Sequence, residues 1–173
     1  MIKTRIVETA IDDKGESYIF SDTKMSGWDL GGHTITDMFF SDTCPPDMLL
    51  ESQEMQDKNF NLKPGQLRFF RSDIPPTKPL YDALPENEKP KNFRDLFYHS
   101  TTTVDYIMVS RGELVMVIGN QDVLLKAGEV VIQRGAAHAW HNYTNEMATI
   151  MGIMIGVELP KQFHRVDTIQ PEN

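Results

Sequence analysis

The stretch Gly128-Glu-Val-Val-Ile-Gln-Arg-Gly-Ala-Ala-His138-Ala-Trp-His-Asn142 decides how this chain is interpreted. It opens on a glycine, continues through a short apolar run and a turn, and ends on a histidine that stands four residues before an asparagine. Alternate residues of an extended strand share a face, so His138, Trp140 and Asn142 are expected to point the same way. The stretch therefore predicts a strand, a tight turn and a second strand that presents an imidazole.

Turn signals recur around this stretch and separate short apolar segments. Gly119-Asn120 stands at two-residue hairpin spacing, and Arg111-Gly112 and Ala127-Gly128 mark other tight turns. No helical pattern of ~10 to 15 residues lies between these segments, which disfavours a parallel α/β sheet. We expect a meander or barrel whose strands span His99–Ser110, Glu113–Ile118, Gln121–Lys126, Glu129–Gln133, His138–Tyr143 and Ala148–Val157.

The first half of the chain has less regularly spaced strand and turn signals. Short apolar stretches at Tyr18–Phe20, Ile35–Phe40 and Leu67–Phe70 are separated by turn-forming clusters, and Glu51–Asn61 is interpreted as a solvated loop. We expect one structural domain in which residues 1–90 supply strands and loops that pack on the barrel or on a partner subunit. Residues 91–160 are expected to form the barrel core, and residues 161–173 a tail.

Composition narrows the class of protein. The 173 residues include 40% apolar and 24% charged residues, as in one ordinary globular domain. The net charge of -8 would repel a phosphate backbone, so we expect no nucleic-acid partner. The apolar run Met147–Val157 is too short to span a membrane. The first residues lack the apolar core of a secretory signal. Cys44 has no partner for a disulfide. The expected location is cytoplasmic, with no membrane partner.

The quoted stretch resembles the second conserved motif of the cupin superfamily. Gly128, His138 and Asn142 match that motif, whereas Arg134 takes the place usually held by proline and the glycine-to-histidine distance is one residue short. The resemblance implies an all-β fold, the cupin double-stranded β-helix or jelly-roll barrel, here with an N-terminal β-rich extension. It also implies pairing through edge strands, so a homodimer is expected.

A partial counterpart of the first cupin motif begins at His99. Thr101 replaces the usual second histidine, Asp105 stands for the usual glutamate, and six residues separate Asp105 from Gly112. The combined pattern is similar to a subgroup of small bacterial cupins of the cupin 2 type, conserved barrels whose function is poorly defined. The resemblance covers about residues 92–157 well and the first 90 residues only loosely.

Strand spacing supports one site that both motifs share. A barrel that brings the two motif strands together would assemble His99, Asp105 and His138 around one point. Two imidazoles and one carboxylate form a set that binds Fe(II), Mn(II), Zn(II) or Ni(II) and leaves positions open for substrate. In the alternative interpretation Asp105 orients His99 or caps a turn, and the pocket holds no metal.

Five further side chains are candidates for contact with a substrate. They are Thr101, Thr103, Gln133, Arg134 and Trp140. Arg134 offers a planar fork that fits a carboxylate, although a structural ion pair is an alternative role. Among the remaining histidines, His141 lies on the face opposite His138 and is expected at the surface or an interface, and His33 and His164 are expected to be solvated.

Two classes of function remain open at this point. The first is a metal-dependent enzyme, an oxidoreductase or lyase, whose dioxygenase, decarboxylase, isomerase or lyase chemistry acts on a small organic substrate in the barrel pocket. The second is a non-catalytic module that binds a small ligand without turnover. Fold alone does not choose between them, and no catalytic residue is assigned.

Overall fold

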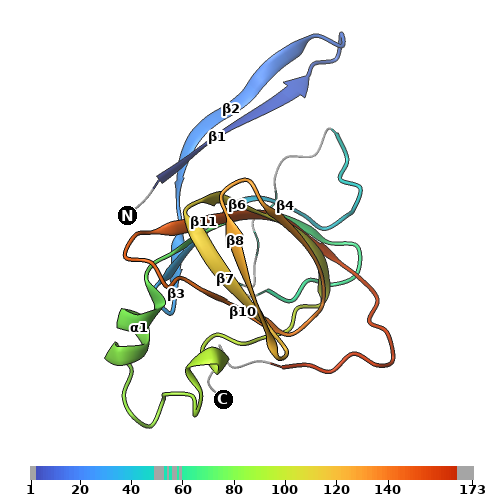
Figure 1. Cartoon of the computed structure of the whole chain (residues 1–173). Helices are drawn as coiled ribbons and strands as arrows, with labels where there is room; N and C mark the ends of the chain where they lie inside the picture. Colours follow the sequence, from blue (N-terminus) through green and yellow to red (C-terminus); the bar gives the residue numbers. More distant parts are fainter. Residues whose placement is uncertain (1–2, 49–52, 54, 56–57, 59, 167–173) are drawn as a thin grey trace.

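Antiparallel strands make up most of the computed structural model, which describes residues 3–48, 53, 55, 58 and 60–166 (Figure 1). Most of the expected loop at residues 51–61 and the last part of the expected tail at residues 161–173 lie outside the described residues. The elements are β1 (Lys3–Ile11), β2 (Ser17–Ser26), β3 (Trp28–Leu30), β4 (His33–Ser41), β5 (Leu67–Ile74), α1 (Thr77–Ala83), the 3₁₀ turn η1 (Phe93–Asp95), β6 (Thr103–Arg111), β7 (Glu113–Ile118), β8 (Gln121–Lys126), β9 (Val130–Arg134), β10 (His138–His141) and β11 (Ala148–Gly156).

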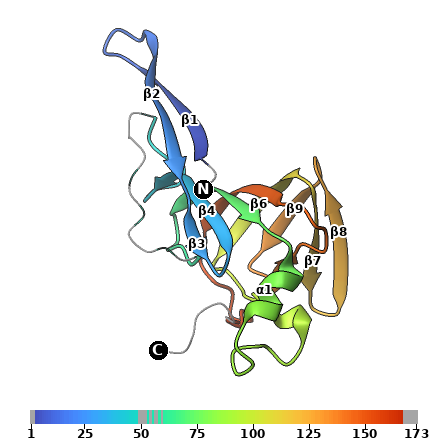
Figure 2. The ribbon, with the colours of Figure 1, turned by 90° about the vertical axis from the view of Figure 1, so that its left-hand side faces the viewer.

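Two sheets enclose the interior of the barrel. The larger sheet has six strands in the order β3-β4-β5-β11-β6-β9, and the smaller has three in the order β10-β7-β8. The view in Figure 1 looks into the space between them. The β1–β2 ribbon forms a separate two-stranded sheet and rises away from the barrel (Figure 2). These features confirm the predicted all-β jelly-roll barrel with a β-rich N-terminal extension.

The strands predicted after residue 98 are found within a few residues of their expected ends. Gly119 adopts a left-handed φ of 54° in the turn that joins β7 to β8, and Ile118 pairs with Gln121 across it. The first predicted strand begins at Thr103 rather than at His99, because His99 makes only an isolated bridge. Period-two alternation is therefore a reliable guide to the strands themselves and a weaker guide to their ends.

Strands from the first half of the chain are integral to the larger sheet. β4 pairs with β5, and β5 pairs with β11 along its whole length, from Leu67 opposite Ile155 to Ile74 opposite Ala148. The expected division at residue 90 therefore does not divide the sheet. These partners lie far apart in sequence, so turn spacing could not reveal their pairing.

A short helix, α1, is present where the sequence predicted none. It follows Pro75-Pro76 and carries Pro79 in its first turn, where the missing N–H would have no helical partner. Its buried Thr77 joins it to the barrel, because the Thr77 N–H donates to the Asn142 carbonyl and the Asn142 N–H donates to Thr77 Oγ1. Among the residues that the structure describes, no helix has the length and apolar character needed to cross a membrane.

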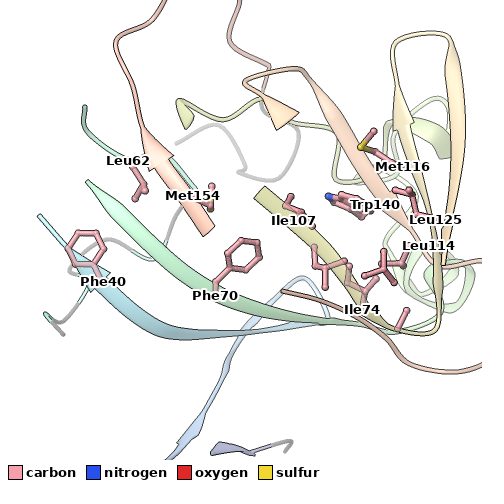
Figure 3. Packing of buried hydrophobic residues seen from close by; sticks show 13 residues of the cluster. Phe40, Leu62, Phe70, Ile74, Ile107, Leu114, Met116, Leu125, Trp140 and Met154 are labelled. Atoms are coloured by element: carbon pink, nitrogen blue, oxygen red, sulfur yellow. The ribbon is translucent and has the colours of Figure 1, made fainter. Parts of the chain in front are cut away.

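The hydrophobic core fills the space between the sheets. Figure 3 shows Phe70 of β5, Ile107 of β6 and Trp140 of β10 converging from both sides of the barrel. Burial of such side chains stabilises the fold by roughly 1.5 to 3 kcal/mol each. The cluster consists of Phe40, Leu62, Phe70, Ile74, Ile107, Val109, Leu114, Met116, Leu125, Trp140, Ala148, Ile150 and Met154.

Gly156 provides a test of how the segment before β5 closes onto β11. Its N–H donates to the Gln66 carbonyl, and a Cβ at this position would lie 1.9 Å from the Lys63 carbonyl oxygen. We expect Gly156→Ala to lower the free energy of unfolding by about 2 kcal/mol or more, because the backbone itself must move. Urea denaturation measures this.

The matched control is Gly15→Ala, where a Cβ meets nothing within 4 Å and only the left-handed φ of 81° opposes it. That strain costs about 1 kcal/mol. Equal losses in the two variants would show that the close approach at Gly156 is unimportant.

Candidate active site

A pocket opens into the barrel interior between the two sheets. It contains about 580 Å³ of space free of atoms, including solvent at its mouth. Apolar side chains form most of its wall, and polar side chains gather in it as a minority. The apolar lining consists of Leu30, Ile35, Phe60, Phe70, Ile74, Phe97, Ile107, Trp140, Ile150 and Met154, and the polar lining of His33, Ser72, His99, Thr101, Asp105 and His138.

The two motif histidines are joined through their backbones. His99 N–H donates to the His138 carbonyl at 2.9 Å and His138 N–H donates to the His99 carbonyl at 2.8 Å, which forms an isolated antiparallel bridge. Residues directly opposite in such a pair present their side chains on the same face. The two imidazole centroids accordingly lie 4.6 Å apart in the pocket wall.

Both imidazoles are oriented in the same way. Nδ1 of His99 lies 2.8 Å from the Phe97 carbonyl oxygen, and Nδ1 of His138 lies 2.9 Å from the Ala136 carbonyl oxygen. A carbonyl can only accept, so Nδ1 must carry the proton in each ring, and Nε2 keeps its lone pair when the ring is neutral. Burial, followed by the neighbouring His99, lowers the pKa of His138 to about 3, so this ring stays neutral near pH 7.

The turn before His99 holds a conformation that side chains rarely adopt. Phe97 has a φ of 60°, the only positive φ of a non-glycine residue in the described structure. Its carbonyl accepts from His99, and its ring contacts His33 with centroids 4.7 Å apart. Strained backbone of this kind persists where the surrounding structure fixes it, and it is common beside functional side chains.

Asp105 is a buried carboxyl group on the inner face of β6. Its Oδ2 accepts from Gln133 Nε2 at 3.1 Å and from Thr101 Oγ1 at 3.4 Å. Its Oδ1 is buried with no hydrogen-bond partner among the described residues. Burial raises the pKa of Asp105 to about 6, against the lowering effect of the neighbouring Thr103 and Thr101 hydroxyls and of the Arg68 charge.

The three predicted metal ligands all line this pocket, but they are not grouped as a set placed to hold a metal ion. His99 and His138 are adjacent, but Asp105 is turned to Thr101 and Gln133 instead of completing a set with them. Across the described residues, which include all three predicted ligands, no group of three or more His, Cys, Asp or Glu side chains is placed to hold a metal ion. Strand alternation placed all three side chains in the pocket wall, but it could not set their separation.

The predicted substrate contacts divide into three groups. Thr101 and Trp140 line the pocket, as expected. Thr103 and Gln133 are buried outside the lining; Gln133 donates to Asp105, whereas Thr103 Oγ1 has no hydrogen-bond partner among the described residues. Arg134 is exposed on the outer face of β9, because it follows the inward Gln133 and neighbouring strand residues point to opposite faces. It therefore does not reach the pocket.

His33 is a pocket residue, and the prediction that it is solvated is wrong. It is buried, its ring lines the pocket, and its Nε2 has no hydrogen-bond partner within the described part of the chain. The pair Gly31-Gly32 before His33 is the sequence signal for this burial. An added Cβ at Gly31 would lie 2.8 Å from the Phe97 ring, and one at Gly32 would lie 2.5 Å from the Leu80 side chain. Close packing of this turn carries His33 into the wall.

The prediction for His141 is also wrong. It does lie on the face of β10 opposite His138, but that face is covered, and the side chain is fully buried between Phe93 and Tyr143 at centroid distances of 5.1 and 5.7 Å. Burial lowers its pKa. His164, by contrast, is exposed, as expected.

Asn142 of the second motif has a structural role. Its Nδ2 donates to the carbonyls of Ile74 and Glu146 at 2.9 and 2.7 Å, and its Oδ1 accepts from the N–H and hydroxyl of Thr144. The side chain is buried and uses its polar atoms to join β5 to the loop after β10. It does not line the pocket.

Parts of the chain are similar in sequence to curated proteins. Oryzines biosynthesis cluster protein J of Aspergillus oryzae is 44% identical over 46 residues, 26% of each chain. The cupin-domain-containing oxidoreductase virC of Hypocrea virens is 34% identical over 62 residues, 35% of this chain and 31% of that protein. Over those 62 residues the chain is similar to a cupin-domain protein. Each of these alignments spans only about a quarter to a third of the curated relative, and both relatives are fungal, so the bacterial subgroup stays a prediction.

Solved structures with a similar barrel are distant in sequence. An ethanolamine utilization protein from Salmonella typhimurium aligns with 91% of this chain and 100% of its own at a TM-score of 0.47 and 14% identity. The Cupin_2 domain of an XRE family transcriptional regulator from Enterobacter cloacae covers 53% of this chain and 83% of its own at a TM-score of 0.38 and 18% identity. No protein-family model matches this chain.

Protonation of His33 should make the fold sensitive to acid. Burial first, then His141 and His99, lower its pKa to about 4, against the raising effect of Asp29. The unfolded chain, with a histidine pKa near 6.5, then binds more protons than the folded chain between about pH 4 and 6.5, so stability is lost as pH falls through that window. His33→Asn should reduce the slope of unfolding free energy against pH by up to ~1.4 kcal/mol per pH unit. Urea denaturation at pH values from 7 to 5 measures this slope.

The control for this experiment is His164→Asn, since that side chain is already exposed. Parallel curves for wild type and His33→Asn would contradict the assignment of His33 as a buried neutral ring.

Proposed function

We propose that this cupin is an enzyme of the isomerase or lyase class that moves a proton on a small, mostly apolar organic molecule. The observation that carries the proposal is Asp105, a buried carboxyl group in a largely apolar pocket, with a pKa raised to about 6 and one oxygen without a partner among the described residues. An enzyme needs such a group poised near the working pH, and burial is the usual means of tuning it.

The lining of the pocket supports this substrate class. The wall is mainly aromatic and aliphatic with a few polar groups, as is usual for small-molecule sites. Burial of apolar substrate surface would supply binding energy at roughly 25 cal/mol per Å². The few polar groups would then fix the orientation of the substrate.

The paired imidazoles suggest what the substrate carries. Because its Nδ1–H is held by a backbone carbonyl, His138 offers Nε2 as a hydrogen-bond acceptor when neutral. It would therefore bind a hydroxyl or N–H group. His33, whose Nε2 has no partner among the described residues, adds a third ring to the same wall.

Asp105 would act as the general base. Above about pH 6 the carboxyl is mainly ionised, and hydrogen bonds from Thr101 and Gln133 hold Oδ2 in place. Oδ1, which the described residues leave without a partner, would accept a proton from the substrate, and the resulting carboxylic acid would return it at another position or to a leaving group. Return to another position gives isomerisation, and return to a leaving group gives elimination.

The sequence predicts a metal-dependent reaction first of all. The set of side chains that would bind the metal is incomplete in this structure. Two imidazoles lie together among the described residues, whereas catalytic metal sites of this type use three protein ligands. The residues present therefore do not fit the predicted Fe, Mn, Zn or Ni centre. The proposed reaction accordingly relies on Asp105 and the imidazoles themselves.

The names of the curated relatives agree with a small organic substrate. Two of them are cluster proteins of oryzine and phomopsin biosynthesis, and a third is named an oxidoreductase. The aligned segments cover a quarter to about a third of those proteins, so their activities reach this chain only as a proposal.

Proton transfer by Asp105 can be tested without knowing the natural reaction. Ligands are first selected by saturation-transfer NMR from a panel of small hydroxylated aromatic and alicyclic ketones, and then incubated with the protein in D₂O. We expect deuterium to enter a carbon-bound position of a bound compound, detected by mass spectrometry. Asp105→Asn should slow this exchange by about 10²- to 10⁴-fold, since general-base catalysis contributes that much.

Asp122→Asn is the control, because Asp122 is an exposed partner of Arg94 outside the pocket. Binding without exchange in the wild type would favour the alternative, a binding module without turnover. Exchange that is unchanged in Asp105→Asn would remove Asp105 from the proposed role.

Loss of the buried charge should also affect stability. The pKa of Asp105 is about 6 in the folded chain and about 4 in the unfolded chain, because burial disfavours the ionised carboxylate. The free energy of unfolding of the wild type therefore falls as pH rises from about 4 to about 6, and it stays low above pH 6. We expect Asp105→Asn to remove this pH dependence and to melt no lower than wild type at pH 8. A large loss of melting temperature at pH 8 would indicate a structural carboxylate.

Metal content decides between this proposal and the metal-dependent alternative. With only two adjacent imidazoles, we expect the untagged protein to retain no stoichiometric Fe, Mn, Zn or Ni after gel filtration, and His138→Ala to leave the measured content unchanged. Elemental analysis by mass spectrometry is the measurement. A stoichiometric metal that His138→Ala removes would instead establish the metal-dependent mechanism.

A further inference from the structure

Two polar side chains of the pocket wall take no part in the proposed proton transfer. Ser72 of β5 is buried and lines the pocket, and its hydroxyl makes no hydrogen bond to the residues that the structure describes. His33 of β4 lines the same pocket, and no described residue bonds to its buried Nε2. Buried polar groups are nearly always hydrogen-bonded, so two that face a pocket without partners indicate a ligand.

These two side chains are neighbours on the inner face of the larger sheet. Ile35 pairs with Ser72 across β4 and β5, and His33 precedes Ile35 by two residues, so it points to the same face. His33 is thus diagonal to Ser72, and diagonal neighbours in a sheet lie about 7 to 8 Å apart. A single polar group held between them can contact both. We call His33 and Ser72 the distal subsite.

The distal subsite lies far from Asp105 along the pocket. Ser72 pairs with Ile150 of β11, and Ile150 pairs with Val109 of β6. Asp105 comes four residues before Val109, which places it roughly 13 Å away along the strand at about 3.3 Å per residue. In a flat sheet, the step from β5 to β6 across β11 adds roughly 10 Å at right angles to the strands. One small polar group therefore cannot occupy both ends of the pocket.

An apolar belt separates these two ends. Gly152 is opposite both Phe70 and Ile107, in the row of residues between the Ser72 row and the Asp105 row. Trp140 faces this row from the smaller sheet, as Figure 3 shows. The pocket is thus polar at each end and apolar, with aromatic side chains, in the middle.

The distal subsite favours an uncharged group. Burial lowers the pKa of His33 to about 4, so its ring is neutral near pH 7. Among the described residues, no lysine or arginine lines the pocket, and a charged ligand group would lose its hydration there without a counter-charge beside it. A neutral imidazole and a serine hydroxyl each offer a hydrogen-bond donor and an acceptor. A ligand hydroxyl, which also donates and accepts, matches both.

We propose that the distal subsite binds a second hydroxyl group of the substrate, at the end remote from the position that Asp105 deprotonates. The identity of the reacting end rests on the proposed function, whereas the subsite itself requires only a bound ligand. The substrate class is thereby narrowed to elongated, uncharged molecules with a polar group at each end and an apolar ring between them. His33 and Ser72 determine the specificity for such molecules.

Two probes that differ only in the remote hydroxyl test the proposal. They are hydroxymethyl para-hydroxyphenethyl ketone, which carries a polar group at each end, and hydroxymethyl phenethyl ketone, which lacks the remote hydroxyl. Isothermal titration calorimetry with the wild-type protein measures both dissociation constants. We expect the phenol to bind about tenfold more tightly, since a hydrogen bond to an otherwise unpaired buried group contributes on that order.

Two variants assign this preference to the distal subsite. Ser72→Ala removes the hydroxyl, and His33→Phe keeps an aromatic ring but removes its nitrogens. Each should reduce the ratio of the two dissociation constants to about twofold or less, because the phenol then loses a partner. Ser110→Ala is the matched control, since Ser110 lies outside the pocket lining and its hydroxyl donates to the Thr149 carbonyl. It should keep the tenfold preference.

Nitrogen NMR of the wild-type histidine side chains gives a measurement that does not depend on a folded His33 variant. We expect the phenol, and not the probe that lacks the remote hydroxyl, to shift the ring-nitrogen resonances of His33. The physical reason is that a new hydrogen bond to an imidazole nitrogen changes the electron density at that atom.

Three results would overturn the proposal. They are equal binding of the two probes by the wild type, a preference that Ser72→Ala leaves at its wild-type value, and failure of both probes to bind at about 1 mM. Deuterium exchange tests the proposed function separately. A preference for the phenol without exchange supports the subsite and removes the reaction, whereas exchange without that preference removes the subsite.

Discussion

The double pairing of β11 is the constraint on which the rest of the structure depends. β11 hydrogen-bonds to β5 on one side and to β6 on the other, and so joins the loosely patterned first half of the chain to the motif-bearing second half. Gly152 lies in its middle, where an added Cβ would lie 3.0 Å from Phe70 and 3.1 Å from Ile107. The strand therefore fixes β5 and β6 relative to each other within the larger sheet, and Asp105 of β6 takes its position from that pairing.

The burial of ionisable side chains in this pocket destabilises the fold, which indicates that these side chains have a functional role. A charged carboxylate or imidazolium loses hydration on burial, and the pKa values of Asp105, His138 and His33 are all shifted toward the neutral form. A core built for stability alone would place apolar side chains there. The chain instead fixes these groups with backbone carbonyls, a strained Phe97 and hydrogen bonds from Thr101 and Gln133. This is the pattern expected of a functional site.

Most of the barrel is predictable because its signals are local. Alternation of apolar and polar residues marks the strands after residue 98, and Gly119-Asn120 marks a hairpin turn that the structure contains. The helix at Thr77–Ala83 escapes prediction because its seven residues are fixed by Thr77 bonding to Asn142, a partner 65 positions away. Likewise, the integration of β4 and β5 into the larger sheet follows from the long-range pairing of β5 with β11, which residue patterns do not encode directly.

The sequence by itself determined which side chains share a face, and the tertiary structure decided what each face meets. Strand periodicity correctly turned His99, Thr101, Asp105, His138 and Trp140 toward one interior. It could not tell that Asp105 would bond to Gln133 instead of joining the two histidines, that Phe93 would cover His141, or that the Gly31-Gly32 turn would bring His33 into the wall. The physical reason is that side-chain direction is a local property of the backbone, whereas separation and burial depend on segments that lie far apart in the chain.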